Sequence, residues 1–144
     1  MIVESLRSAI SGRLMMIASY ASVATAARAL LDRNIGLLVV CGSEGEAVGV
    51  LSRLDLVRHL ADEETRESLA SLMSTDIVSC RPEDDLFGTW KVMMAHGLQS
   101  LPVLDIESRP VGVLDLRDVL GALFEEEQYQ EQLLENYVAG LGYN

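Results

Sequence analysis

Two short motifs in this chain carry residue types that could bind a ligand. Ser52 and Asp55 follow the apolar run 48–51, and Asp115 and Asp118 follow the similar run 111–114, 63 residues later. Each motif is predicted to open a helix. A hydroxyl and the free N–H groups of a helix N-terminus suit a phosphate, and a carboxylate one turn along can accept hydrogen bonds from ribose hydroxyls.

The first motif also has a purely structural interpretation. Ser52 at the N-cap would accept a hydrogen bond from the first turn, and Asp55 would return one to the N-cap backbone. Such a capping box stabilises a helix by about 1 kcal/mol. Because capping pairs are common, the spacing alone favours the cap over a nucleotide site. The rest of the chain has to decide between the two hypotheses.

The 63-residue offset extends well beyond these motifs. Val40 aligns with Val103, Glu44 with Glu107, and the apolar or polar character of the aligned positions agrees over most of the chain. An internal repeat of this size predicts two copies of one supersecondary unit. The sequence therefore consists of two copies of one structural unit.

Each copy has the same predicted order of elements, strand–helix–strand–strand–helix, which makes the fold α+β. Apolar residues at helical spacing predict the helices, and polar turn-like connectors separate the paired strands. In the first copy we expect strands at 14–17, 37–41 and 47–51, with helices at 22–33 and from 52. In the second copy we expect strands at 77–80, 101–104 and 110–114, with helices at 84–96 and from 115.

Composition limits the classes of function. A half of about 60 residues buries only a marginal core, so the two halves should pack on each other. The net charge of −11 argues against nucleic acid as a partner, since nucleic-acid binding needs a basic surface. No apolar run approaches the roughly 20 residues that span a bilayer, and no secretory signal begins the chain. We expect a cytoplasmic protein with no membrane partner.

Neither catalysis nor metal binding is indicated. Cys41 and Cys80 align with Leu104 and Ile17, which predicts buried, reduced strand cysteines. The two histidines stand in unrelated places, and no metal-ligand spacing is present. No nucleophile has a recognisable partner base. We therefore expect no catalytic residues, no metal site, no required cofactor and no enzyme activity.

The motifs resemble those of the cystathionine-β-synthase (CBS) domain. The residues that carry the resemblance are Leu-Val-Val at 38–40 with Val-Gly-Val-Leu-Ser-x-x-Asp at 48–55, and Leu-Pro-Val-Leu-Asp at 101–105 with Val-Gly-Val-Leu-Asp-x-x-Asp at 111–118. The resemblance runs from about residue 9 to 124. It implies a tandem CBS pair, or Bateman module, packed about a pseudo-twofold axis, with repeats at 1–63 and 64–124 and an acidic helical extension at 125–144.

In that family the clefts between repeats bind adenosine derivatives such as AMP, ADP, ATP or S-adenosylmethionine. The resemblance implies a first nucleotide-binding cleft at Val50, Ser52, Asp55, Ile77, Val78, Gln99 and Ser100. It implies a second cleft at Leu14, Met15, Gly36, Leu37, Val113, Asp115 and Asp118.

The chain departs from the family pattern in both clefts. Asp115 stands where Ser or Thr is usual, and a carboxylate there would repel a phosphate at close range. The second cleft is therefore expected to be empty, to hold an uncharged nucleoside or to need a bridging cation. Gln99 and Ser100 stand where some members place His and Arg. Solvated roles are expected for the nearby arginines, Arg13, Arg53 and Arg81.

The resemblance implies a regulatory module that senses an adenine nucleotide and signals to an effector protein whose identity the sequence does not reveal. The alternative is a scaffold without a ligand that serves dimerisation or protein interaction. After the second copy, apolar stripes predict continued helix, with Tyr129, Leu133, Tyr137 and Leu141 spaced by four. This helix either folds back on its own core or reaches a second subunit. We favour a homodimer, because CBS pairs commonly dimerise through helices.

Overall fold

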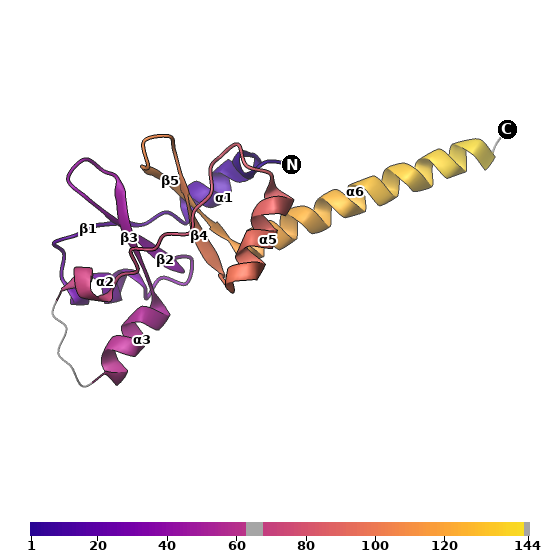
Figure 1. Ribbon diagram of the computed structural model, residues 1–144. Helices are drawn as coiled ribbons and strands as arrows, with labels where there is room; N and C mark the ends of the chain where they lie inside the picture. Colours follow the sequence, from indigo (N-terminus) through magenta and orange to yellow (C-terminus); the bar gives the residue numbers. More distant parts are fainter. Residues whose placement is uncertain (63–67, 143–144) are drawn as a thin grey trace.

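The computed structural model describes residues 1–62 and 68–142 and confirms the α+β prediction (Figure 1). Its helices are η1 (Val3–Leu6), α1 (Arg7–Gly12), α2 (Val23–Ala29), α3 (Arg53–Ala61), α4 (Leu69–Leu72), α5 (Leu86–His96) and α6 (Leu116–Gly142). Its strands are β1 (Met16–Ala18), β2 (Leu37–Cys41), β3 (Ala47–Ser52), β4 (Ser100–Leu104) and β5 (Pro110–Asp115).

Each repeat builds its own small sheet. In the first repeat β2 lies between β1, which it pairs in parallel, and β3, which it pairs antiparallel. In the second repeat β4 and β5 form the matching antiparallel pair. The two hairpins have equivalent registers, for Val39 faces Val50 as Pro102 faces Val113. The strands predicted at 37–41, 47–51, 101–104 and 110–114 are present to within one residue.

Several predicted elements differ from the structure. The strand expected at 14–17 runs from Met16 to Ala18, and the helix expected at 84–96 begins at Leu86. The strand expected at 77–80 is reduced to one parallel bridge between Cys80 and Val103. The segment first bridges to Val50 of the other repeat at Ser74, and it meets β4 only at Cys80. The helix expected at 22–33 ends at Ala29, because the chain then turns and Arg53 binds the carbonyl oxygens that follow.

The repeats exchange their N-terminal helical segments. Ile10 of α1 is buried in the core of the second repeat, and Leu69 of α4 is buried in the core of the first. A Cβ atom on Gly112 would touch Ile10, and one on Gly49 would touch Met73. Both pairs of equivalent residues are 63 positions apart, and such reciprocity is what a pseudo-twofold relation produces. Neither half therefore has a complete core of its own.

A third apolar cluster joins the two sheets. Leu37 and Val39 of β2 pack with Val113 of β5, and all three are less than 9% exposed. Backbone also crosses between the repeats, because the N–H of Ala47 donates to the carbonyl of Ser108 at 2.9 Å. This shared layer fixes how the two repeats face one another.

Helix α6 begins in the core and then leaves it. Val119 and Ala122 are buried against the second repeat, whereas every side chain from residue 127 to 140 is exposed. Figure 1 shows the distal part of α6 running away from the rest of the molecule. The prediction that the helix continues is confirmed, and in this chain it does not fold back on its own core. None of the helices in the described residues is long and apolar enough to cross a membrane.

Candidate functional site

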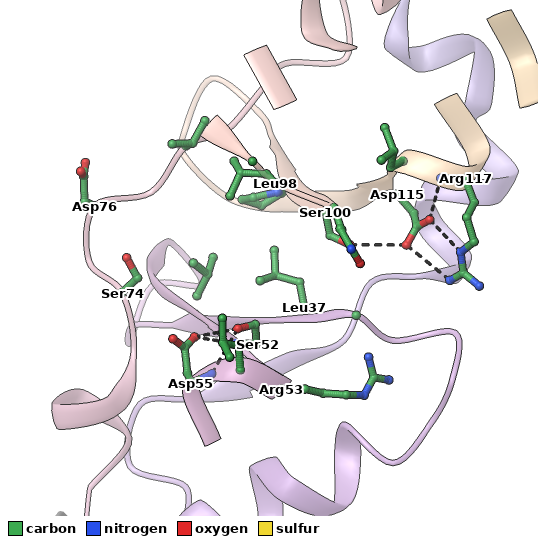
Figure 2. Close-up of a pocket in the computed structure, with 18 of the residues that line it drawn as sticks. Leu37, Ser52, Arg53, Asp55, Ser74, Asp76, Leu98, Ser100, Asp115 and Arg117 are labelled. Carbon is green, nitrogen blue, oxygen red and sulfur yellow. Dashed lines mark hydrogen bonds and ion pairs between the residues drawn. The ribbon is translucent and has the colours of Figure 1, made fainter. Parts of the chain in front are cut away.

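A cleft of about 1010 Å³ lies between the two repeats (Figure 2). Its volume is at the upper end of the roughly 300–1,000 Å³ typical of small-molecule sites. The first repeat lines it with the start of α3 and the chain before β2, and the second repeat lines it with residues 74–78, residues 97–102 and the start of α6. It is therefore a site that only the packed pair can form.

At the first-repeat end of the cleft, Ser52 and Asp55 form the capping box that their spacing predicted. The backbone N–H of Ser52 donates to Asp55 Oδ2 at 2.8 Å, and the N–H of Asp55 donates to Ser52 Oγ at 3.4 Å. The Ser52 hydroxyl also donates to Asp55 Oδ2 at 3.1 Å. Both residues line the cleft, so the cap and the candidate ligand groups are the same atoms.

At the second-repeat end, Asp115 occupies the place of Ser52 and makes a different set of contacts. Its Oδ1 accepts hydrogen bonds from the backbone N–H of Arg117 at 2.9 Å and from Arg117 Nε at 3.0 Å. Its Oδ2 lies 3.4 Å from Ser100 Oγ and 3.9 Å from Arg13 Nη1. The carboxylate thus holds the start of α6 and is surrounded by donors.

Asp118 does not face the cleft as a free carboxylate. Arg13 donates two hydrogen bonds to it, from Nε to Asp118 Oδ2 at 2.5 Å and from Nη2 to Asp118 Oδ1 at 3.2 Å. Both side chains are mostly buried, at 16% and 20% exposed, and Arg13 also donates to the carbonyl of Asn34. The pair ties the segment after α1 to α6. The expectation that Arg13 is solvated was therefore wrong.

The ion pairs of this cluster shift the pKa values of Asp115 and Arg13 so that both groups stay charged. Burial alone would raise the pKa of Asp115, but the hydrogen bonds from Arg117 and the charges of Arg13 and Arg117 outweigh it and lower the pKa below its ordinary value. The hydrogen bond to Asp118 chiefly raises the pKa of Arg13. Asp115 is therefore ionised at neutral pH, and its charge is compensated by two guanidinium groups.

The structure brings together residues from both predicted clefts along one cleft. Those that line it are Val50, Ser52, Asp55, Val78, Gln99 and Ser100 from the first set, and Gly36, Leu37 and Asp115 from the second. Ile77, Leu14, Met15, Val113 and Asp118 are not among its lining residues. Val113 is buried in the cluster that joins the two sheets, and the partly buried Leu14 packs against that cluster.

Sequence reasoning missed several lining residues. Arg33, Arg58 and Arg117 bring positive charge to the cleft, and Ser74 and Asp76 line its wall. Their signal in the sequence is weak, because only the tertiary packing carries them to the motif residues. Arg53 was expected in solvent, but its guanidinium donates to the carbonyls of Leu30, Asp32 and Ile35.

The two free cysteines differ in burial. Cys80 is buried, and burial raises the pKa of its thiol to about 12. Cys41 is only partly buried, so the prediction of burial holds for one of the two cysteines. Within residues 1–62 and 68–142, no group of three or more His, Cys, Asp or Glu side chains is arranged to hold a metal ion.

Comparison with known families decides the identity of the repeats. The sequence profile of the CBS domain matches residues 6–62 and 69–125. The chain belongs to the CBS domain family. It is a tandem CBS pair, as the motifs indicated.

Solved CBS structures share its fold. The CBS domain pair of protein MJ0100, in complex with 5′-methylthioadenosine and S-adenosyl-L-methionine, superposes with a TM-score of 0.76 at 20% identity, over 88% of this chain and 98% of that one. CBSX2 in complex with AMP superposes with a TM-score of 0.71 at 20% identity, over 85% of this chain and 97% of that one. Protein ATU1752 from Agrobacterium tumefaciens superposes with a TM-score of 0.73 at 24% identity, over 85% of this chain and 98% of that one. At these identities the likeness establishes the fold.

Sequence relatives include larger proteins. A 17.7 kDa protein of Acidianus ambivalens is 23% identical over 109 residues, which are 76% of this CBS pair and 66% of the relative. Homoserine O-acetyltransferase of Methanococcoides burtonii is 27% identical over 99 residues, or 69% of this chain but 20% of the enzyme. The γ-3 subunit of 5′-AMP-activated protein kinase from Sus scrofa is 28% identical over 120 residues, and the match covers 76% of this chain and 23% of that subunit. The CBS pair therefore matches only a part of these enzymes and subunits.

Proposed function

We propose that this CBS pair binds an adenosine derivative in the cleft between its repeats and acts as a regulatory module for a partner protein. The observation that carries the proposal is the cleft itself, which both repeats line and which opens at the N-terminus of α3 with Ser52 and Asp55. The complexes of the structural neighbours with 5′-methylthioadenosine, S-adenosyl-L-methionine and AMP support it.

The proposed contacts follow from the chemistry of the motif. The Ser52 hydroxyl and the first N–H groups of α3 would face a phosphate, and Asp55 would accept from the ribose hydroxyls. Because the two side chains are hydrogen bonded to each other at 3.1 Å, the ligand has to share or replace that bond. Leu116 and Leu120 of α6 also line the cleft, so a bound ligand would bias the position of α6, which a partner can detect.

Thermal denaturation with a matched pair of cap variants tests the proposal. Ser22 caps α2 as Ser52 caps α3, since it accepts from the N–H of Thr25 at 3.1 Å, but it does not line the cleft. Ser22→Ala and Ser52→Ala should each lose about 1 kcal/mol of stability. Ligand at a concentration a hundredfold above its Kd should raise the free energy of unfolding by about 2.7 kcal/mol, which corresponds to about 9 °C in Tm.

The two variants should then respond differently to the ligand. We expect AMP, ADP, ATP or S-adenosylmethionine to raise the Tm of the wild type and of Ser22→Ala, with a reduced shift in Ser52→Ala. The absence of a shift with every member of this panel in the wild type would refute the nucleotide proposal.

A second candidate function, a dimerising interaction module, is favoured by the distal part of α6. Tyr129, Leu133, Leu134, Tyr137 and Val138 are each at least half exposed, which is unusual for an isolated helix of a monomer. We propose that this helix contributes to a homodimer. Light scattering on the full chain and on a chain that ends after residue 126 tests it, since removal of the helix should convert dimer to monomer, and a monomeric full chain would refute it.

A further inference from the structure

The two repeats differ at two neighbouring positions of the cleft motif. Where the first repeat has Ser52 and Leu54, the second has Asp115 and Arg117. A carboxylate thus replaces the hydroxyl in the same motif in which an arginine replaces a leucine two residues later. Both Asp115 and Arg117 line the cleft. The second motif therefore carries an ion pair where the first carries a hydroxyl.

The geometry of this ion pair shows which partner meets the ligand. Arg117 binds Asp115 through Nε at 3.0 Å and Nη2 at 3.4 Å. The Asp115 side chain is 8% exposed, whereas that of Arg117 is 64% exposed. Within residues 1–62 and 68–142, neither the hydrogen bonds nor the ion pair of the Arg117 guanidinium uses Nη1. The carboxylate is covered, and the guanidinium keeps donors available to the cleft.

The positive charges of Arg13 and Arg117 offset the repulsion between the Asp115 carboxylate and a phosphate. Asp118 is neutralised by Arg13, and Arg13 also lies 3.9 Å from Asp115. The four charges cancel, and Arg117 is the exposed member of the set. A guanidinium held by a buried carboxylate loses little freedom when it binds a phosphate, and such charge-assisted hydrogen bonds are strong.

Gly36 lines the cleft next to this pair and packs closely against it. A Cβ atom on Gly36 would lie 3.0 Å from Ser100 Oγ and 3.9 Å from Asp115 Oδ2. Figure 2 shows Asp55 and Arg117 at opposite ends of the cleft, with Leu37 and Ser100 between them. Because Asp55 and Arg117 line the same cleft, a nucleoside polyphosphate with its ribose at Asp55 would extend its phosphates toward Arg117.

We infer that Arg117, positioned by Asp115, is the anion-binding side chain at the second-repeat end of the cleft, and that it selects a nucleoside di- or triphosphate over adenosine. The nucleoside part of this statement rests on the proposed function, whereas the anion site does not. Asp115 is here a positioning residue, and its carboxylate acts on the ligand through Arg117.

Isothermal titration calorimetry with ATP, adenosine and inorganic tripolyphosphate tests the inference on the full chain. Arg117→Gln is compared with Arg7→Gln, which makes the same charge change at an exposed arginine paired with Glu4 outside the cleft. We expect Arg117→Gln to weaken the binding of ATP and tripolyphosphate at least tenfold, or by about 1.4 kcal/mol, and to leave adenosine binding unchanged, because only the phosphates accept charge-assisted hydrogen bonds from Arg117. Arg7→Gln should bind like the wild type.

Asp115→Asn separates positioning from simple electrostatics. Removal of a negative charge beside the cleft should strengthen anion binding if charge alone matters. We expect the opposite, a several-fold weaker binding of ATP, because Arg117 is no longer held. An Arg117→Gln protein with the wild-type ratio of ATP to adenosine affinity would overturn the inference. If tripolyphosphate binding depends on Arg117 while no adenine ligand binds, the proposed function fails and the anion site stands. If neither tripolyphosphate nor ATP binds the wild type, both are wrong.

Discussion

Substitution of two equivalent glycines by alanine tests how the repeats interlock. Gly49 of β3 and Gly112 of β5 are 63 residues apart, and each is covered by the exchanged segment of the other repeat. A Cβ on Gly112 would lie 2.9 Å from the backbone carbonyl carbon of Ile10 and equally close to its Cβ and Cγ1. A Cβ on Gly49 would instead meet the Sδ and Cγ atoms of Met73. One added methyl group therefore meets backbone in one repeat and a flexible side chain in the other.

The expected cost differs accordingly. Met73 has rotatable bonds and a soft thioether, so Gly49→Ala should cost about 1 kcal/mol. Gly112→Ala has to displace the backbone of α1 and should cost about 3 kcal/mol, at the upper end for an overpacked core. The effect on the unfolded chain is the same in both variants and cancels in the comparison. For 144 residues, 1 kcal/mol corresponds to about 3 °C, so the two Tm values should differ by about 6–7 °C.

Urea denaturation followed by circular dichroism, together with thermal melts, measures both free energies of unfolding. A Gly49→Ala,Met73→Ala double variant serves as the control, because truncation of Met73 removes the two closest atoms and leaves a Cβ contact at 3.2 Å. Steric relief should then make the Gly49→Ala step less costly than in the wild type. Equal losses in the two single variants, or a larger loss in Gly49→Ala, would refute the exchange of segments as the cause.

Three further outcomes follow from the described contacts. Leu69→Ala should cost about 2–5 kcal/mol in urea and should reduce hydrogen-exchange protection in β2, because Leu69 is fully buried in the first-repeat core; unchanged protection there would contradict the packing. The stabilisation that Asp115 gains from its lowered pKa is complete at neutral pH and is lost as the pH falls below about 4, so the Tm gap between wild type and Asp115→Asn should narrow only there. In native protein at pH 8, a thiol reagent should label Cys41 slowly and Cys80 only on unfolding, since burial raises both thiol pKa values and that of Cys80 to about 12; rapid labelling of Cys80 would contradict this.

Much of the fold could be predicted from local pattern. Strand alternation, turn-like connectors and the 63-residue echo predicted the hairpins β2–β3 and β4–β5 to within a residue. Predictions that depended on distant partners failed. The strand predicted at 77–80 is only a single bridge at Cys80, because the preceding segment pairs with the other repeat at Ser74. Helix α2 ended early where Arg53, more than 20 residues away, binds its trailing carbonyl groups.

The sequence by itself determined the repeat, the CBS fold and the capping chemistry of Ser52 and Asp55, because these depend on residues close together in the chain. It also showed that Asp115 replaces a hydroxyl. Only the tertiary structure decided what that replacement means. Arg13, which lies 102 residues earlier, comes within 3.9 Å of Asp115, and together with Arg117 it neutralises the carboxylate. Charge compensation depends on distances in space, and those are set by the packing of the two repeats rather than by the order of residues.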